Sequence, residues 1–280
     1  MPPDALAPRN ESRLAKEMAL RGHDLAMMAT ATNYDLGDKR ERKRSASDLA
    51  RFFLRASKAI DVDLFIEAGA KEASSSRRAT KFLDDARIVA FEANPLTYEE
   101  FRGVNDPSTG IEYLHLALSS EPGEVTFHVR QNADGSLRPD GHGSLMARTD
   151  DCRDTYEEVR VQATTLDTFF AGHDYDQCAM WVDVEGGVKD VFAGGTATLD
   201  KAAVMIIEVE DTPLWKGAWT YPEVASFLYD RRLVPIARDY EYRRQYNVVF
   251  VREDLLHDDM LRLRLTQHLS STRGSKATPG

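Results

Sequence analysis

Short apolar runs alternate with amphipathic stretches of helical spacing through most of the chain. The apolar runs are typical of buried strands and lie at residues 64–66, 88–91, 111–118, 159–163, 179–184 and 204–209. Helical spacing recurs at residues 76–83, 95–102, 165–170, 188–193 and 221–229. Because a crossover helix returns the chain to the same edge of a sheet, this alternation predicts an α/β fold with a mostly parallel sheet.

Four segments depart from that alternation. Residues 123–129 alternate apolar and polar side chains, as in a half-exposed strand of a hairpin or sheet edge. Residues 233–237 and 247–251 are predicted to pair in antiparallel fashion and to close the sheet. The run from Gln131 to Glu158 has little periodicity, and its length favours a functional loop or lid.

Both ends of the chain are expected to lie outside the main domain. Residues 1–58 are predicted to be an N-terminal helical extension, with a disordered start, helices at 11–28 and 47–55, and a polar connector between them. The first helix would either dock beside the main domain or form a dimer contact. Residues 59–265 are predicted to be the main domain, and the polar residues 266–280 a flexible tail.

Composition and charge narrow the class of protein. The 280 residues are 42% hydrophobic and 29% charged, as in ordinary globular proteins, and they contain no apolar run of bilayer length. The N-terminus lacks the basic and apolar regions of a secretory signal, and Cys152 and Cys178 make neither a disulfide framework nor a zinc spacing. These observations favour a cytoplasmic protein. The net charge of −10 disfavours nucleic acid as a partner.

Acidic side chains follow three of the predicted strands. Glu67 comes directly after the first strand, with Gly69 two residues later, and Glu92 ends the second. Asp183 and Glu185 lie at the end of a third. The carboxyl ends of parallel strands share one edge, so these acids predict a single acidic crevice, unless they only cap the helices that follow. An acidic crevice suits a cationic sulfonium cofactor better than a pyrophosphate, which needs glycines and helix N-termini.

Several segments, taken in order, resemble the FkbM-type S-adenosylmethionine-dependent methyltransferases. They lie at residues 65–70, 89–95, 117–127, 143–145, 161–167 and 182–186, and the resemblance extends roughly over residues 64–252. It implies a Rossmann-like class I methyltransferase fold, which has a mostly parallel seven-stranded sheet, helices on both faces and an antiparallel last strand.

The resemblance also implies roles for individual residues. Glu67 and Gly69 would line the methionine end of S-adenosylmethionine, and Glu92 would hold its ribose. The remaining positions are Ala117 and Leu118 beside the adenine, Ser144 in a loop that covers the cofactor or acceptor, and Asp183 with Glu185 at the reacting end.

Methyl transfer to a hydroxyl requires that the hydroxyl lose its proton. Asp183 is the first candidate for the base, or it could bind a divalent metal together with Glu185 and so lower the pKa of the hydroxyl. His142, in the loop, is the next candidate because the ordinary pKa of histidine lies near neutrality.

These features predict an O-methyltransferase that acts on a hydroxyl of a small metabolite, sugar or glycan. We expect no membrane span, and a homo-oligomer, if formed, would use the N-terminal helices. One alternative is a binding protein that kept the fold but lost catalysis, because Lys71 and Ala73 replace the asparagine and second glycine that are usual in the family. The other is an NAD-type oxidoreductase, although the turn after Ile66 lacks the three-glycine fingerprint.

Overall fold

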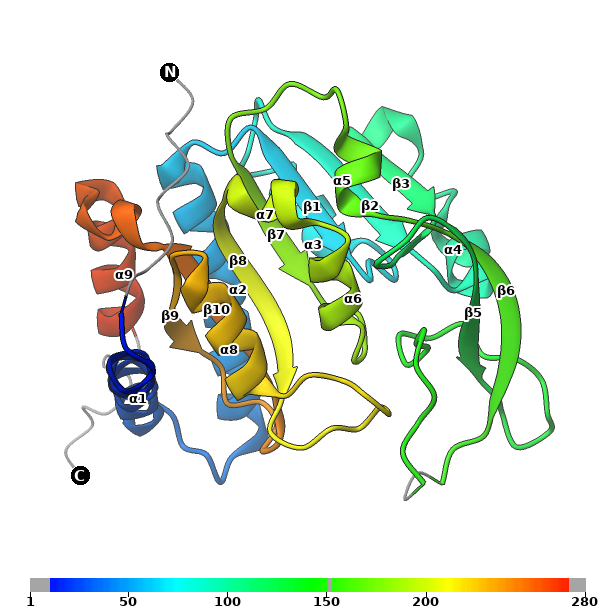
Figure 1. Ribbon diagram of the computed structural model, residues 1–280, viewed down its shortest axis with the longest axis horizontal. Coiled ribbons are helices and arrows are strands. Elements are labelled where there is room, and N and C mark those ends of the chain that lie inside the picture. Colours follow the sequence, from blue (N-terminus) through cyan, green and yellow to red (C-terminus); the bar gives the residue numbers. More distant parts are fainter. Residues whose placement is uncertain (1–10, 151–152, 272–280) are drawn as a thin grey trace.

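A seven-stranded sheet forms the centre of the computed structural model, which describes residues 11–150 and 153–271 (Figure 1). Its strand order is β3-β2-β1-β7-β8-β10-β9. The strands are β1 (Leu64–Ala68), β2 (Arg87–Glu92), β3 (Ile111–His115), β7 (Cys178–Val182), β8 (Ala202–Glu210), β9 (Leu233–Arg238) and β10 (Gln245–Arg252). Among these strands β10 alone runs in the direction opposite to the others, which confirms the predicted Rossmann-like α/β sheet and its antiparallel last strand.

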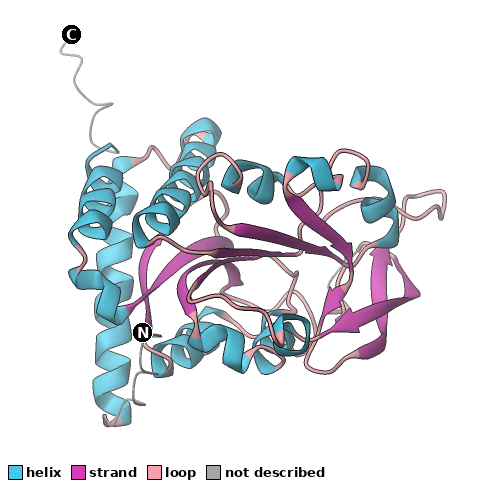
Figure 2. Ribbon diagram, turned by 90° about the horizontal axis from the view of Figure 1, so that it is seen from above, coloured by secondary structure: helices cyan, strands magenta, loops and turns pink. Residues whose placement is uncertain are grey.

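Helices cover both faces of this sheet, as Figure 2 shows with the sheet between two helical layers. One layer, which packs on the face with Phe65, Ala90 and Val204, contains α2 (Lys39–Ile60), α3 (Ser74–Ala79), α4 (Pro95–Phe101) and α9 (Asp259–Ser271). The other contains α1 (Arg13–Ala29), α5 (Leu166–Phe170), α6 (Val188–Ala193), α7 (Thr196–Asp200) and α8 (Tyr221–Asp230). The described residues also form three 3₁₀ helices, η1 (Thr30–Asn33), η2 (Pro107–Thr109) and η3 (Glu253–His257).

A small second sheet with the order β4-β6-β5 lies beyond β3, the edge strand of the seven-stranded sheet (Figure 1). It consists of β4 (Ala117–Leu118), β5 (Gly123–Arg130) and β6 (Tyr156–Thr164). The predicted continuous strand at 111–118 is therefore wrong, because the chain leaves β2 after His115 and pairs Ala117 and Leu118 with β6. An unbroken apolar run does not reveal that its two halves have different partners.

The N-terminal half of α2 corrects a second expectation. Residues 39–44, predicted to belong to a connector, form its first turns, and the Asp38 side chain caps the helix by accepting from the Arg40 N–H. Lysine, arginine and glutamate are good helix formers, so a charged run can continue a helix outward from an apolar one. Leu49, Phe52 and Phe53 are buried in the core, and the predicted domain boundary after residue 58 falls within the last turn of α2.

The C-terminal end of the described chain corrects a third expectation. Residues 266–271 continue α9 instead of starting a tail, and the His268 ring stacks on Phe52 of α2 at 4.8 Å between ring centroids. The predicted disordered start, the rest of the predicted tail and Cys152 lie outside the described residues, whereas Cys178 is a buried free thiol. Among the described helices, none combines the length and apolar character needed to cross a membrane.

Candidate functional site

A cavity opens where β1, β2 and β7 end, bounded on its other side by the small sheet and the loop after β5. It holds about 570 Å³ of empty space. Its lining residues come from the strand ends (Gly69, Lys71, Phe91, Glu92, Ala93, Asp183, Val184, Glu185, Gly187), from the chain around β4 (Leu116, Ala117, Leu118) and from β5 and its loop (Phe127, Asp140, Gly141, Gly143, Leu145). Six predicted site residues, Gly69, Glu92, Ala117, Leu118, Asp183 and Glu185, thus border one cavity.

The turn after β1 can lie against the end of β7 only because residue 69 is a glycine. Its φ of 77° is left-handed, and a Cβ there would be 1.8 Å from the Asp183 carbonyl oxygen. The backbone N–H groups of Gly69 and Ala70 both donate to the carbonyl of Phe91, which ties the turn to β2. Lys71 follows at φ 47° and Ala73 at φ 55°.

Glu92 is buried at the end of β2 and joins this turn to the start of α4. Its carboxylate accepts from the Lys71 N–H at 2.6 Å and from the Asn94 N–H at 2.7 Å. Burial raises the pKa of Glu92 to about 7, although both hydrogen bonds act in the opposite direction. A carboxylate accepts about four hydrogen bonds, so Glu92 keeps acceptor capacity toward the cavity.

Glu67 lies elsewhere, and the structure does not bring it to the cavity lining. Its carboxylate caps α3, accepting from the backbone N–H groups of Ser75 and Ser76 at 3.3 and 2.8 Å and from the Ser76 hydroxyl at 2.5 Å. Burial raises the pKa of Glu67 to about 7 against the opposing effect of these bonds. Glu67 is therefore an acid at a strand end that caps the helix after it, the alternative to a place in the crevice.

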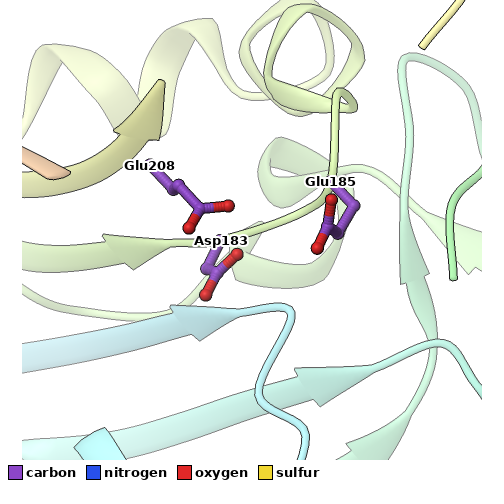
Figure 3. A group of neighbouring side chains, drawn as sticks. All are labelled: Asp183, Glu185 and Glu208. Carbon is purple, nitrogen blue, oxygen red and sulfur yellow. The ribbon is translucent and has the colours of Figure 1, made fainter. Parts of the chain in front are cut away.

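Three carboxyl groups meet on the β7–β8 side of the cavity, and Figure 3 shows them turned toward one another. Asp183 follows β7, Glu185 lies in the next loop and Glu208 projects from β8, with carboxylate oxygens within 4.8 Å of one another. Burial, reinforced by the charge of Glu185, raises the pKa of Asp183 to about 7. Burial and Asp183 raise the pKa of Glu208 well above its usual value, and a hydrogen bond joins these two groups.

Glu208 was not among the site residues predicted from the sequence. The residue lies inside the most apolar strand of the chain, where its only signal is a single acid among Met205, Ile206, Ile207 and Val209. Gln245 on β10 donates to Glu208 at 2.7 Å and fixes the orientation of the carboxyl group. The three carboxyl groups can share a proton or offer oxygen ligands to a divalent cation.

Glu185 anchors the loop that covers the cavity. Its carboxylate accepts from the indole N–H of the fully buried Trp215 at 3.2 Å and lies 3.4 Å from His142 Nδ1. The Ser144 hydroxyl donates to the Glu185 carbonyl at 2.7 Å. The hydrogen bond to Glu185 raises the pKa of His142. The structure thus places both predicted loop residues, His142 and Ser144, against Glu185, while Gly143 and Leu145 line the cavity itself.

Comparison with known proteins adds a family and several relatives. The family described as "Methyltransferase FkbM domain" matches residues 67–244. The 2-O-methyltransferase NoeI of Sinorhizobium fredii is 26% identical over 179 residues, which cover 61% of this chain and 73% of that protein.

Two solved structures illustrate the structural likeness. An O-methyltransferase family protein from Burkholderia thailandensis is 7% identical, with a TM-score of 0.41, over 76% of this chain and 58% of that one. The 1,6-didemethyltoxoflavin-N1-methyltransferase of the same organism, with bound S-adenosylhomocysteine, is 11% identical, with a TM-score of 0.38, over 88% and 94% of the two chains.

Proposed function

The chain belongs to the FkbM-domain methyltransferase family, and from that premise we propose that it transfers a methyl group from S-adenosylmethionine to a hydroxyl of a small metabolite, sugar or glycan. The observation that carries this proposal is the single cavity bordered by Glu92 at one end and by Asp183 and Glu185 at the other. The 2-O-methyltransferase relative supports oxygen as the acceptor atom.

The lining of the cavity has the chemistry for this cofactor. Phe91, Ala117 and Leu118 offer an apolar wall for the adenine, and the free acceptor capacity of Glu92 suits the ribose hydroxyls. The acidic groups at the β7 side would attract the positively charged sulfonium.

Asp183 is the group best placed to remove the proton of the acceptor. A base works most efficiently when its pKa lies near the working pH, and burial places the pKa of Asp183 at about 7. His142 is less suited, because its raised pKa keeps it protonated to a larger extent near neutrality. S-adenosylmethionine supplies an electrophilic methyl group. Asp183 would take the proton that the acceptor hydroxyl gives up when it is methylated.

Binding and turnover measured separately test this proposal. Calorimetry with S-adenosylhomocysteine, S-adenosylmethionine and NAD should give heat with the two sulfur ligands only. The Asp183→Asn enzyme should lose methyl transfer to hydroxylated metabolites and glycans yet bind S-adenosylhomocysteine within about twofold of wild type, since a neutral amide of equal size cannot take the proton. Asp200→Asn, at an exposed position, serves as the control. An active Asp183→Asn enzyme would reject Asp183 as the base.

A divalent metal is the second way to activate the hydroxyl. Asp183, Glu185 and Glu208 offer oxygen ligands of the kind that Mg²⁺ and Mn²⁺ prefer. Activity that is lost on dialysis against EDTA and returns with either ion would assign that role to the cluster. Activity that survives EDTA would leave Asp183 as the base without a metal.

A binding protein without turnover is the competing function, and the backbone at Ala73 favours it. Ala73 has a left-handed φ of 55°, which suits the glycine usual in the family better than alanine. Normal binding of S-adenosylhomocysteine without methyl transfer to any acceptor would support this alternative. The family match gives no support to an NAD-type oxidoreductase.

A further inference from the structure

Lys71 brings a positive charge to an otherwise acidic cavity. Among the described lining residues it has the only cationic side chain, whereas Glu92, Asp140, Asp183 and Glu185 are acidic. Asp140 forms ion pairs with Arg130 at 2.8 Å and Arg138 at 3.2 Å, and neither arginine lines the cavity. Lys71 is therefore the charged group of the described lining that would attract an anion.

The backbone of Lys71 is fixed, while its side chain is not. Its N–H donates to Glu92 on β2, and its carbonyl accepts from the Tyr113 hydroxyl on β3. The side chain runs past Gly141, where a Cβ would lie 3.3 Å from Lys71 Cδ. The ammonium is 3.7 Å from Glu72, beyond hydrogen-bond distance, and the side chain is 49% exposed. Lys71 thus holds a loosely paired charge at the rim of the cavity, available to a ligand.

S-adenosylmethionine has two cationic groups, the sulfonium and the α-ammonium, and one anionic group, the α-carboxylate. The four acidic residues suit the cations but would repel the carboxylate. Because β1 lies between β2 and β7, the Gly69–Lys71 turn lies between Glu92, the proposed ribose site, and Asp183, the proposed methyl site. The turn would therefore face the amino-acid end of the cofactor. On the basis of the proposed function, we propose that the Lys71 ammonium binds the α-carboxylate of S-adenosylmethionine and selects cofactors that carry this group.

The test compares two ligands that differ only in the carboxylate. Calorimetry is done with S-adenosylhomocysteine and with its decarboxylated analogue, 5′-deoxy-5′-(3-aminopropylthio)adenosine. Lys71→Met should weaken binding of S-adenosylhomocysteine by about three- to fivefold, the upper part of the range for an exposed charge pair, and leave the analogue within about twofold of wild type. Lys71→Arg should retain most of the affinity for both ligands.

A lysine elsewhere provides the matched control. Lys58 is 58% exposed and also forms a loose ion pair, at 3.4 Å from Asp84, so Lys58→Met should change neither affinity. Equal weakening of both ligands by Lys71→Met would show that Lys71 acts through the fold of the turn, and no weakening would show that it makes no contact. Either result rejects the proposed role of Lys71 and leaves the proposed function standing. If wild type binds neither ligand, both the proposed function and the role of Lys71 are rejected.

Discussion

At the scale of single residues, burial is the factor that sets the chemistry of the site. Glu67, Glu92 and Asp183 are all carboxyl groups whose pKa burial raises to about 7. Their neighbours decide what each can do, because Glu67 faces the N-terminus of α3 and Asp183 faces Glu208. The same residue type, at the same kind of strand end, is a helix cap in one case and a candidate base in the other.

The raised pKa of Glu67 predicts a pH-dependent stability. In the unfolded chain Glu67 releases its proton near its ordinary value of 4.5, whereas the folded protein keeps it until about pH 7. The folded state therefore holds the extra proton between these values, so the contribution of Glu67 to stability is lost as pH rises through this window. The Tm of wild type should fall relative to that of Glu67→Gln, which has no titrating group there, from pH 5 to pH 8. A constant difference across this range would contradict the shift.

Removing the Glu92 carboxylate should weaken cofactor binding. The Glu92→Ala protein should bind S-adenosylhomocysteine about 1–3 kcal/mol more weakly, the cost of losing a charged hydrogen-bond acceptor, as measured by calorimetry. Glu112→Ala is a control away from the cavity, since Glu112 on β3 pairs with Arg87 at an exposed position. Unchanged affinity in Glu92→Ala would remove Glu92 from the ribose site.

At the scale of elements, three connections build the site on a rigid sheet. The turn after β1 lies against the end of β7, the loop after β7 carries Glu185, and the loop after β5 meets Glu185 through His142 and Ser144. Trp215, from the segment between β8 and α8, supports Glu185 from a further direction. The β7 side of the cavity thus depends on segments far apart in the sequence.

The turn after β1 allows a matched pair of substitutions. Gly69 and Gly110 have nearly the same left-handed φ, 77° and 76°, but an added Cβ meets the Asp183 carbonyl at Gly69 and open space at Gly110. Gly110→Ala should therefore cost only the backbone strain, about 1–2 kcal/mol. Gly69→Ala should lower Tm clearly more and weaken binding of S-adenosylhomocysteine, because the ends of β1 and β7 must move apart. Equal Tm losses would show that the close approach to Asp183 is unimportant.

At the scale of the whole molecule, α1 is apolar on two sides. Leu20 and Met27 pack against the core, whereas Leu14, Met18 and Leu25 are 66%, 66% and 73% exposed. A surface helix normally has a polar outer side. That a homo-oligomer, if formed, uses the N-terminal helices stays a prediction, and this outer side of α1 is the surface on which to test it.

Sedimentation analysis provides that test. We expect wild type to associate at micromolar concentrations and a Met18→Glu, Leu25→Glu double variant to be monomeric, because buried glutamates without partners are costly. Leu263→Glu, at a 45% exposed position on α9, should leave the association unchanged. A monomeric wild type would contradict the expectation. The cytoplasmic location likewise stays a prediction.

The order of strands and helices was determined by the sequence by itself. Apolar runs such as 204–209 and helical spacing such as 221–229 follow from which side chains must leave water, a local property of the chain. The same reasoning located Gly69, Glu92 and Asp183, because every parallel strand presents its carboxyl end at the same edge. Local patterns could not reveal that the run at 111–118 is divided between two sheets or that the charged residues 39–44 continue a helix.

Only the tertiary structure decided which acids lie close together. Glu208 lies beside Asp183 because β8 pairs with β7. Glu67 instead accepts hydrogen bonds at the start of α3, because the N–H groups of Ser75 and Ser76 lie within its reach. The role of a carboxyl group depends on the donors, charges and water around it, and the fold brings these together from distant parts of the chain.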